Sequence, residues 1–154
     1  MRTSWNAPAI RAVKTTDGSS AQPLVMVTAY DAPGAKMAHA AGVDLILVGD
    51  SVAMVVLGHD DTLSVTVEDI AHHTGAVARA KPSALIVADL PWMSYHVSVE
   101  DTVRNAATLV RSGAQAVKLE GGRKRVTMIE ALVDAEIPVM GHIGLTPQSV
   151  QSMG

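Results

Sequence analysis

Five short runs of apolar residues recur along the chain, and each run is apolar throughout instead of alternating with polar residues. Continuous apolar strands are typical of a parallel sheet that is buried on both faces. The runs that we expect to form strands are residues 24–29, 43–49, 83–88, 114–119 and 137–141.

Stretches with helical signals separate these runs. Gly42 is suited to end the first helix, and Asp31 is better explained as its N-cap than as a catalytic residue. Thr66 and Ser98 are suited to cap the next two helices. Alternation of strand and helix predicts right-handed βαβ units and therefore an α/β fold. The expected helices are residues 31–41, 66–80, 98–111 and 123–135.

The length of the chain limits the architecture. It has 154 residues, whereas a closed (β/α)₈ barrel typically needs about 250. The pattern therefore fits either a doubly wound open sheet or part of a barrel. Residues 1–23 are polar and contain the Gly/Ser-rich segment 16–20, so we interpret them as an N-terminal arm or short helix. Residues 24–154 are interpreted as one partial (β/α) barrel domain, truncated after about the fifth strand.

Composition excludes several classes of protein. Hydrophobic residues make up 48% of the chain and charged residues 18%, which is incompatible with extensive disorder. The net charge of −3 gives no basic surface for a nucleic acid. There is no cysteine, and no apolar run long enough to span a bilayer. We therefore expect a cytoplasmic protein with no nucleic-acid or membrane partner.

Carboxylates follow the second, third and fourth apolar runs, as Asp50, Asp89 and Glu120. Parallel strands lie about 4.8 Å apart, and their carboxyl ends meet at one edge of the sheet. Three carboxylates this close repel one another unless a cation lies between them, and oxygen-only ligands favour Mg²⁺. The alternative is that each aspartate only caps a helix, although the next helices start several residues later.

Other strand-end residues complete the candidate pocket. Lys118 lies two residues before Glu120, so both side chains face the same side of a strand. Lys118 is expected to pair with the acidic cluster or to bind an anionic substrate. Tyr30 and His142, which end the first and last runs, are further pocket candidates.

Six short motifs at these strand ends resemble the ketopantoate (3-methyl-2-oxobutanoate) hydroxymethyltransferase family. The resemblance covers residues 24–154, and its specificity comes from the order of the motifs instead of from any single one. The motifs are Thr28-Ala29-Tyr30-Asp31, Val48-Gly49-Asp50-Ser51, Gly58-His59-Asp60, Ala88-Asp89-Leu90-Pro91, Lys118-Leu119-Glu120-Gly121-Gly122 and the segment from Gly141 to Val150.

The resemblance implies a (β/α)₈ barrel of the phosphoenolpyruvate mutase/ketopantoate hydroxymethyltransferase kind, usually assembled as a homodecamer. It implies hydroxymethyl transfer from 5,10-methylenetetrahydrofolate to 3-methyl-2-oxobutanoate, giving 2-dehydropantoate for pantothenate synthesis. By position, Asp50, Asp89 and Glu120 match the family's Mg²⁺ ligands. Asp50, Ser51, Asp89 and Lys118 match its oxoacid-binding residues. The Mg²⁺ ion would act as a Lewis acid on the keto group, so that an enolate can form.

The resemblance also implies that one catalytic part is missing. The family's general base is a glutamate on the next strand, expected beyond Gly154, so we expect this chain alone to be inactive or nearly so. Two other interpretations stay open. One is a related Mg²⁺-dependent oxoacid lyase or mutase of the phosphoenolpyruvate mutase and isocitrate lyase type. The other is a non-catalytic fragment that binds Mg²⁺ and an oxoacid.

Overall fold

The computed structural model describes residues 4–13 and 23–153, and its centre is a parallel sheet of five strands in the order β1-β2-β3-β4-β5. This confirms the predicted parallel α/β sheet. The order runs without the reversal that defines a doubly wound sheet. The strands are β1 (Met26–Thr28), β2 (Leu45–Val48), β3 (Leu85–Asp89), β4 (Ala116–Glu120) and β5 (Val139–His142).

Each observed strand begins two residues after the start of its predicted run. The skipped residues include Val43, Ala84, Ala114 and Ile137, which are buried as they approach the sheet but are not part of a strand. Burial of these approach residues extends the apolar pattern beyond the strand itself. At the other end, β3, β4 and β5 extend one residue past the prediction, so that Asp89, Glu120 and His142 are strand residues.

Four helices follow the predicted pattern, and their caps explain where they begin and end. The Asp31 carboxylate accepts a hydrogen bond from Gly34 N at 2.7 Å, which confirms its role as an N-cap. Thr66 caps the second helix in a reciprocal capping box with Asp69, and Ser98 caps the third. Gly42 ends the first helix in the left-handed conformation. These helices are α2 (Ala32–Ala41), α4 (Val67–Arg79), α5 (Val99–Arg111) and α6 (Val126–Asp134).

Several short elements depart from the predictions. The predicted helix over 123–135 is divided, because Gly121 and Gly122 have positive φ and the chain first forms a 3-10 turn. The predicted loop 144–148 turns helical at Pro147, whereas the predicted loop 16–20 lies outside the described residues. The short elements are α1 (Ala7–Ala12), α3 (Val52–Val55), η1 (Gly122–Arg125), η2 (Pro147–Ser149) and α7 (Val150–Met153).

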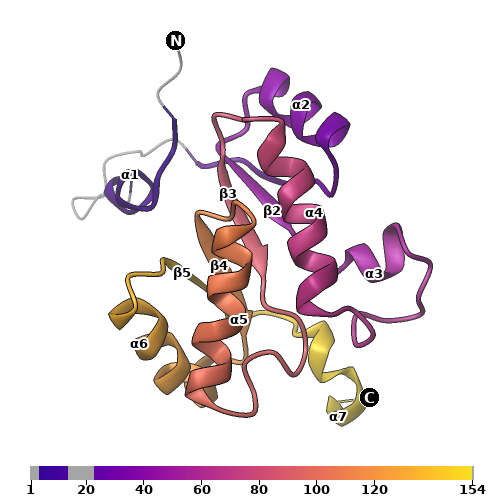
Figure 1. The fold of residues 1–154 in the computed structure, drawn as a ribbon, viewed down its shortest axis with the longest axis vertical. Helices are drawn as coiled ribbons and strands as arrows, with labels where there is room; N and C mark the ends of the chain where they lie inside the picture. The colour runs from indigo at the N-terminus through magenta and orange to yellow at the C-terminus, as the bar shows by residue number, and fades with distance from the viewer. Residues whose placement is uncertain (1–3, 14–22, 154) are drawn as a thin grey trace.

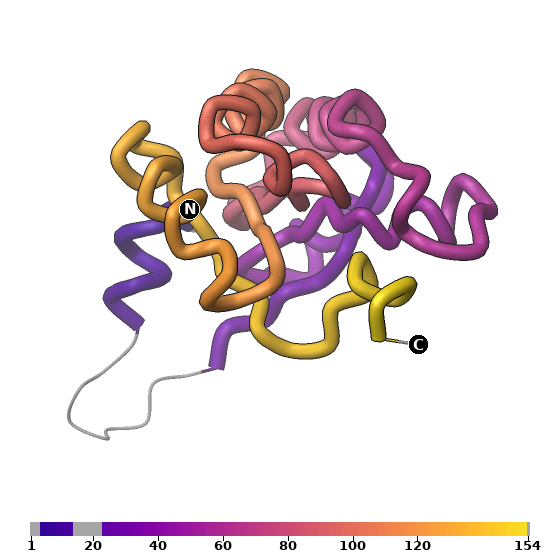
Figure 2. The backbone as a smooth tube through the Cα atoms, turned by 90° about the horizontal axis from the view of Figure 1, so that it is seen from below, coloured from indigo at the N-terminus to yellow at the C-terminus, as the bar shows by residue number. Residues whose placement is uncertain are grey.

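The two faces of the sheet carry different layers (Figure 1). The main core packs strand residues such as Ile46 and Val117 against Ile70 of α4 and Leu109 of α5. Figure 2 shows these helices side by side on one side of the strands. The opposite face carries a smaller apolar cluster, against which Trp5 and Ile10 of the N-terminal arm pack. This cluster consists of Leu45, Leu85, Val87 and Ala116.

Two further features of the helices are their positions relative to the ends of the strands and their length and apolarity. Segments α3 and α7 lie at the end of the sheet where the strands finish, while α1 lies away from that end (Figure 1). No helix within the described residues is both long enough and apolar enough to cross a bilayer.

Candidate active site

The polar strand-end residues share the face of the sheet that the main helices leave free. Successive side chains of a strand alternate between faces, so Asp89 lies on the same face as Leu85 and Val87. By the same rule, Lys118 and Glu120 share the face of Ala116 in β4. The predicted common orientation of Lys118 and Glu120 follows directly from this register.

Asp89 is the central acidic residue of the site. Its Oδ1 atom lies 2.8 Å from Nζ of Lys118, its direct partner in the β3–β4 register. Its Oδ2 atom accepts a hydrogen bond from Asp50 N at 3.0 Å. The residue is only 2% exposed, and this burial raises its pKa to about 6, although Lys118 opposes the shift. Without a further cation, the buried carboxylate is therefore incompletely stabilised.

Glu120 forms a second pair with its own register partner, His142 of β5. The distance between His142 Nδ1 and Glu120 Oε2 is 3.1 Å. The other carboxylate oxygen, Oε1, accepts a hydrogen bond from the backbone N of Gln148 at 3.0 Å. Both oxygens of this buried carboxylate thus have partners within the chain.

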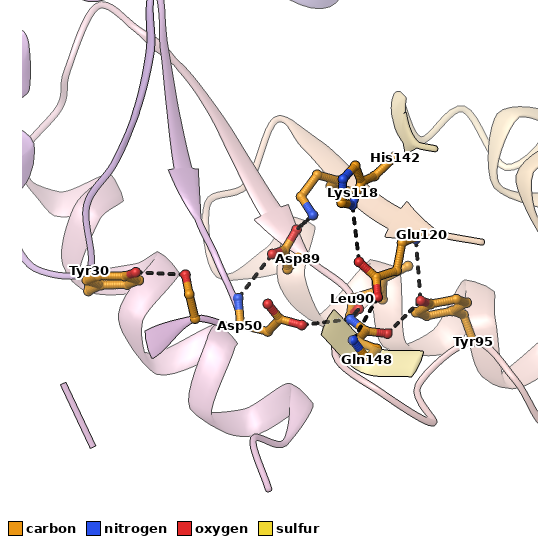
Figure 3. Close-up of polar contacts among 10 residues, drawn as sticks. Tyr30, Asp50, Asp89, Leu90, Tyr95, Lys118, Glu120, His142 and Gln148 are labelled. Atoms are coloured by element: carbon orange, nitrogen blue, oxygen red, sulfur yellow. Dashed lines mark hydrogen bonds and ion pairs between the residues drawn. The ribbon is translucent and has the colours of Figure 1, made fainter. Parts of the chain in front are cut away.

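Gln148 joins the two acidic groups, as Figure 3 shows. Its Nε2 atom donates to Asp50 Oδ2 at 2.7 Å and to the Leu90 carbonyl at 3.1 Å. Its Oε1 atom accepts from the Tyr95 hydroxyl at 2.6 Å, and that hydroxyl accepts from Glu120 N at 3.3 Å. Burial raises the pKa of Tyr95, so the hydroxyl stays protonated and can donate. The Gln148 amide therefore lies between Asp50 and Glu120.

Tyr30 and Ser51 form a separate polar pair. Their hydroxyl oxygens lie 2.8 Å apart. Figure 3 places Tyr30 on the opposite side of Asp50 from Glu120 and Tyr95. Gly49 fits closely here, because a Cβ atom at this position would lie 2.9 Å from Ser51 Oγ and 3.4 Å from Asp89 Oδ2.

The donor atoms suit a hard cation in part. Asp50 and Asp89 are buried carboxylates at neighbouring strand ends, and apart from its ion pair with Lys118, Asp89 Oδ1 has no hydrogen-bond partner. Glu120 instead faces His142 and Gln148. Among residues 4–13 and 23–153, no group of three or more His, Cys, Asp or Glu side chains is arranged to hold a metal ion. Ligation of Mg²⁺ by Asp50, Asp89 and Glu120 stays a prediction.

The site also contains residues that the sequence analysis did not single out. Gln148 and Tyr95 supply most of the hydrogen bonds between the acidic groups. Gln148 lies within the family motif from Gly141 to Val150, and its place in that motif could have identified it as a site residue. Tyr95 had no comparable signal, because it lies in the long loop after Asp89 and far from Gln148 in sequence.

Comparison with known proteins shows which family the chain belongs to. The sequence profile of the ketopantoate hydroxymethyltransferase family matches residues 7–154. The chain belongs to the ketopantoate hydroxymethyltransferase family. The match includes α1 and all five strands, and it confirms the resemblance that the six motifs indicated.

Curated relatives in this family are named 3-methyl-2-oxobutanoate hydroxymethyltransferase. The chain is 59% identical to the Ignicoccus hospitalis protein over 86% of its own length and 51% of the relative. It is 61% identical to the Pyrobaculum islandicum protein, over 86% of this chain and 51% of the relative. For the Bacillus subtilis protein, the identity is 59% over 88% of this chain and 49% of the relative. The chain spans about half the length of these relatives.

Solved structures show the same fold in distant proteins. A phosphoenolpyruvate phosphomutase from Streptomyces platensis subsp. rosaceus superposes with a TM-score of 0.70 at 20% identity, covering 90% of this chain and 54% of that one. A 2,3-dimethylmalate lyase of the phosphoenolpyruvate mutase/isocitrate lyase superfamily gives a TM-score of 0.65 at 19% identity, covering 99% and 55%. At this level of identity, the likeness establishes the fold alone.

Proposed function

We propose that this chain forms the oxoacid- and metal-binding half of a Mg²⁺-dependent 3-methyl-2-oxobutanoate hydroxymethyltransferase with a (β/α)₈ barrel. The reaction would transfer a one-carbon unit from 5,10-methylenetetrahydrofolate to the oxoacid, on the route to pantothenate. The observation that carries this proposal is the buried Asp89–Lys118 pair beside Asp50 and Glu120, in a chain of this family.

Lys118 is proposed to bind and orient the oxoacid. Its ammonium group is mostly buried, with 15% of the side chain exposed, and it is the positive member of the central pair. A desolvated ammonium group interacts strongly with a carboxylate or a developing enolate oxygen. Ser51 is proposed to donate a hydrogen bond to the oxoacid, because its hydroxyl is held in place by Tyr30.

Asp50 and Asp89 are proposed to hold Mg²⁺, with Glu120 completing the acidic set. When bound, the ion supplies Lewis acidity to the 2-oxo group. The chain's own contribution is to desolvate the carboxylates and to fix Asp50 through Gln148. His142 is proposed to hold Glu120 in place.

No residue of this chain is proposed as the base that removes the C3 proton, so we propose that the chain alone is inactive or nearly so. We further propose that the complete enzyme is a cytoplasmic homo-oligomer. The relatives, which are about twice as long, are the basis for assigning the remaining catalytic part to a further segment.

Calorimetric titration tests the binding half directly. Mg²⁺ and 3-methyl-2-oxobutanoate should bind the wild-type chain, and Asp89→Asn should weaken Mg²⁺ binding at least tenfold. Asp60→Asn is the matched control, because Asp60 is exposed in the loop after Gly58. Equal Mg²⁺ affinity of Asp89→Asn and wild type would refute the ligand assignment. Absence of oxoacid binding with and without Mg²⁺ would refute the proposed function.

A further inference from the structure

The orientation of the Ser51 hydroxyl is restricted by two neighbours. The hydroxyl oxygen of Tyr30 lies 2.8 Å from Ser51 Oγ. The other neighbour is Gly49, where a Cβ atom would lie 2.9 Å from the same oxygen, so the hydroxyl fits against the end of β2 only because no side chain is present. The Ser51 hydroxyl therefore keeps its orientation as long as Tyr30 keeps its position.

Tyr30 itself lies in a loop and not in a regular element. It follows β1, which ends at Thr28, and it precedes Asp31, the N-cap of α2. Loop residues are held less firmly than strand residues unless contacts from elsewhere in the fold fix them. For Tyr30, such contacts come from α4, a helix that is distant in sequence.

His73 of α4 contacts Tyr30 in two ways. Its Nδ1 atom lies 2.8 Å from the carbonyl oxygen of Tyr30, across 43 positions of sequence. A carbonyl oxygen can only accept a hydrogen bond, so Nδ1 carries the hydrogen and donates it. The two rings also meet edge to face, with 6.4 Å between their centroids and 77° between their planes, which is a favourable arrangement for aromatic rings. His73 thus fixes both the backbone and the ring of Tyr30.

Helix α4 is a firm support for this histidine. The helix has 13 residues and begins with a reciprocal capping box. Ile70, Thr74 and Val77 on its inner side are completely buried, and Thr74 directly follows His73. His73 itself is half-buried, whereas the adjacent His72 is exposed. The position of the His73 ring is therefore set by a packed helix, and His72 provides a matched control on the same element.

We infer that His73 is a positioning residue for the oxoacid site, which acts through Tyr30 on the Ser51 hydroxyl. This inference rests on the proposed function, in which Ser51 contacts the oxoacid, and adds a residue of α4 to that site. Without the His73 hydrogen bond, Tyr30 can shift and the Ser51 hydroxyl loses its fixed orientation. Binding of the oxoacid then has to restore that orientation, which lowers the affinity.

Calorimetric titration of the full chain with 3-methyl-2-oxobutanoate, in the presence of Mg²⁺, tests the inference. His73→Leu cannot donate a hydrogen bond and should weaken oxoacid binding roughly fivefold or more. His73→Asn places an amide N–H at the position of Nδ1 and should restore the affinity to within about twofold of wild type. His73→Gln places its amide nitrogen where the other ring nitrogen lies, so it should weaken binding as His73→Leu does. His72→Leu should leave the affinity unchanged.

A double-mutant cycle tests the path through Tyr30. Tyr30→Phe removes the hydroxyl that contacts Ser51, so His73→Leu should have less than about a twofold further effect on oxoacid affinity in that background. A histidine that only stabilises the fold would instead weaken binding equally in both backgrounds. His73→Gln serves in the same cycle if His73→Leu does not fold.

A measurement without oxoacid separates this inference from the proposed function. The chain has only two tyrosines, so 3-fluorotyrosine gives two fluorine NMR signals, and Tyr30→Phe identifies the signal of Tyr30. Ser51→Ala should shift that signal in wild type and shift it less in His73→Leu. An equal shift in both, or an oxoacid affinity unaffected by His73→Leu and His73→Gln, overturns the inference and leaves the proposed function standing. Failure of the wild-type chain to bind the oxoacid overturns both.

Discussion

Asp89 and Lys118 face each other directly across the β3–β4 register, with 2.8 Å between their charged atoms. A cross-strand pair of this kind is fixed by the backbone hydrogen bonds of two strands, not by a loop. The positions of the central anion and cation are therefore set by the fold itself. Sites on regular elements hold their geometry more closely than sites on loops.

Protonation of Asp89 should make the stability of the chain depend on pH. Burial raises the pKa of Asp89 from 3.8 to about 6, so the folded state binds the proton more tightly than the unfolded state. In metal-free buffer, this group favours folding most below about pH 4. We expect its contribution to fall by on the order of 3 kcal/mol as the pH rises through about 6.

Urea denaturation of wild type and Asp89→Asn at several pH values between 4 and 7 measures this effect. The free energy of unfolding of wild type should decline relative to that of Asp89→Asn across the interval. A constant difference between the two proteins would show that Asp89 does not titrate in this range.

Removal of the Gln148 amide should destabilise the chain. Gln148→Leu leaves the Tyr95 hydroxyl without its acceptor and a buried carboxylate oxygen of Asp50 without its donor. Unpaired buried polar groups of this kind cost about 2–3 kcal/mol in total. Gln151→Leu changes an exposed glutamine in the same segment and is the control. Equal urea midpoints for the two variants would contradict the bridging role of Gln148.

Gly113 is predicted to be intolerant of a side chain. Its φ of +113° is unfavourable for other residues, and a Cβ atom would lie 2.4 Å from Ala78 Cβ. We expect Gly113→Ala to cost about 3 kcal/mol, from backbone strain and overpacking together. Gly58→Ala is the control, since it has a φ of +79° but an open surrounding, and should cost about 1 kcal/mol.

A double-mutant cycle separates strain from collision at Gly113. Ala78→Gly removes the atom that the new side chain would meet, so the cost of Gly113→Ala should decrease in that background. Thermal unfolding of the four proteins gives the coupling energy. Additive effects would show that the two positions do not collide.

The cap of α4 should contribute more than the cap of α5 at neutral pH. Hydrogen bonds from Thr66 lower the pKa of Asp69, so this contribution is present above the ordinary pKa of a carboxyl group and is lost as the pH falls. Thr66→Ala should cost about 1 kcal/mol at pH 7. Ser98→Ala should cost less, because Asp101 makes no reciprocal hydrogen bond to Ser98.

Comparison of the two variants at pH 7 and pH 3 gives the measurement. The difference between their free energies of unfolding should shrink as the pH is lowered, because protonation of Asp69 weakens the hydrogen bonds that its carboxylate accepts from Thr66. A difference that stays unchanged with pH would exclude a role for the Asp69 carboxylate in the capping box.

Local patterns predicted the scaffold and the strand-end residues, because strand burial and helix capping leave signals within a few positions. Asp31, Thr66 and Ser98 all cap the helices expected from their neighbours. The positions of Asp89 and Lys118 on adjacent strands followed from the parallel order.

Contacts that depend on the folding of a distant loop were not predictable in this way. Gln148 reaches Asp50 across 98 positions of sequence, and Tyr95 reaches Gln148 across 53. No local pattern encodes such contacts. For the same reason, the orientation of Glu120 toward His142, instead of toward Asp50, emerged only from the three-dimensional arrangement.

The N-terminal arm is attached to the sheet at the end remote from Asp89: Trp5 N donates to the carbonyl of Ser83, just before β3, at 2.9 Å. The contacts that anchor the N-terminal arm and the candidate active site therefore lie at opposite ends of the same strands. Sequence changes around Trp5 and Ile10 should alter the melting temperature without altering ligand affinity. An engineer could therefore strengthen the scaffold at one end while leaving the recognition properties of the other untouched.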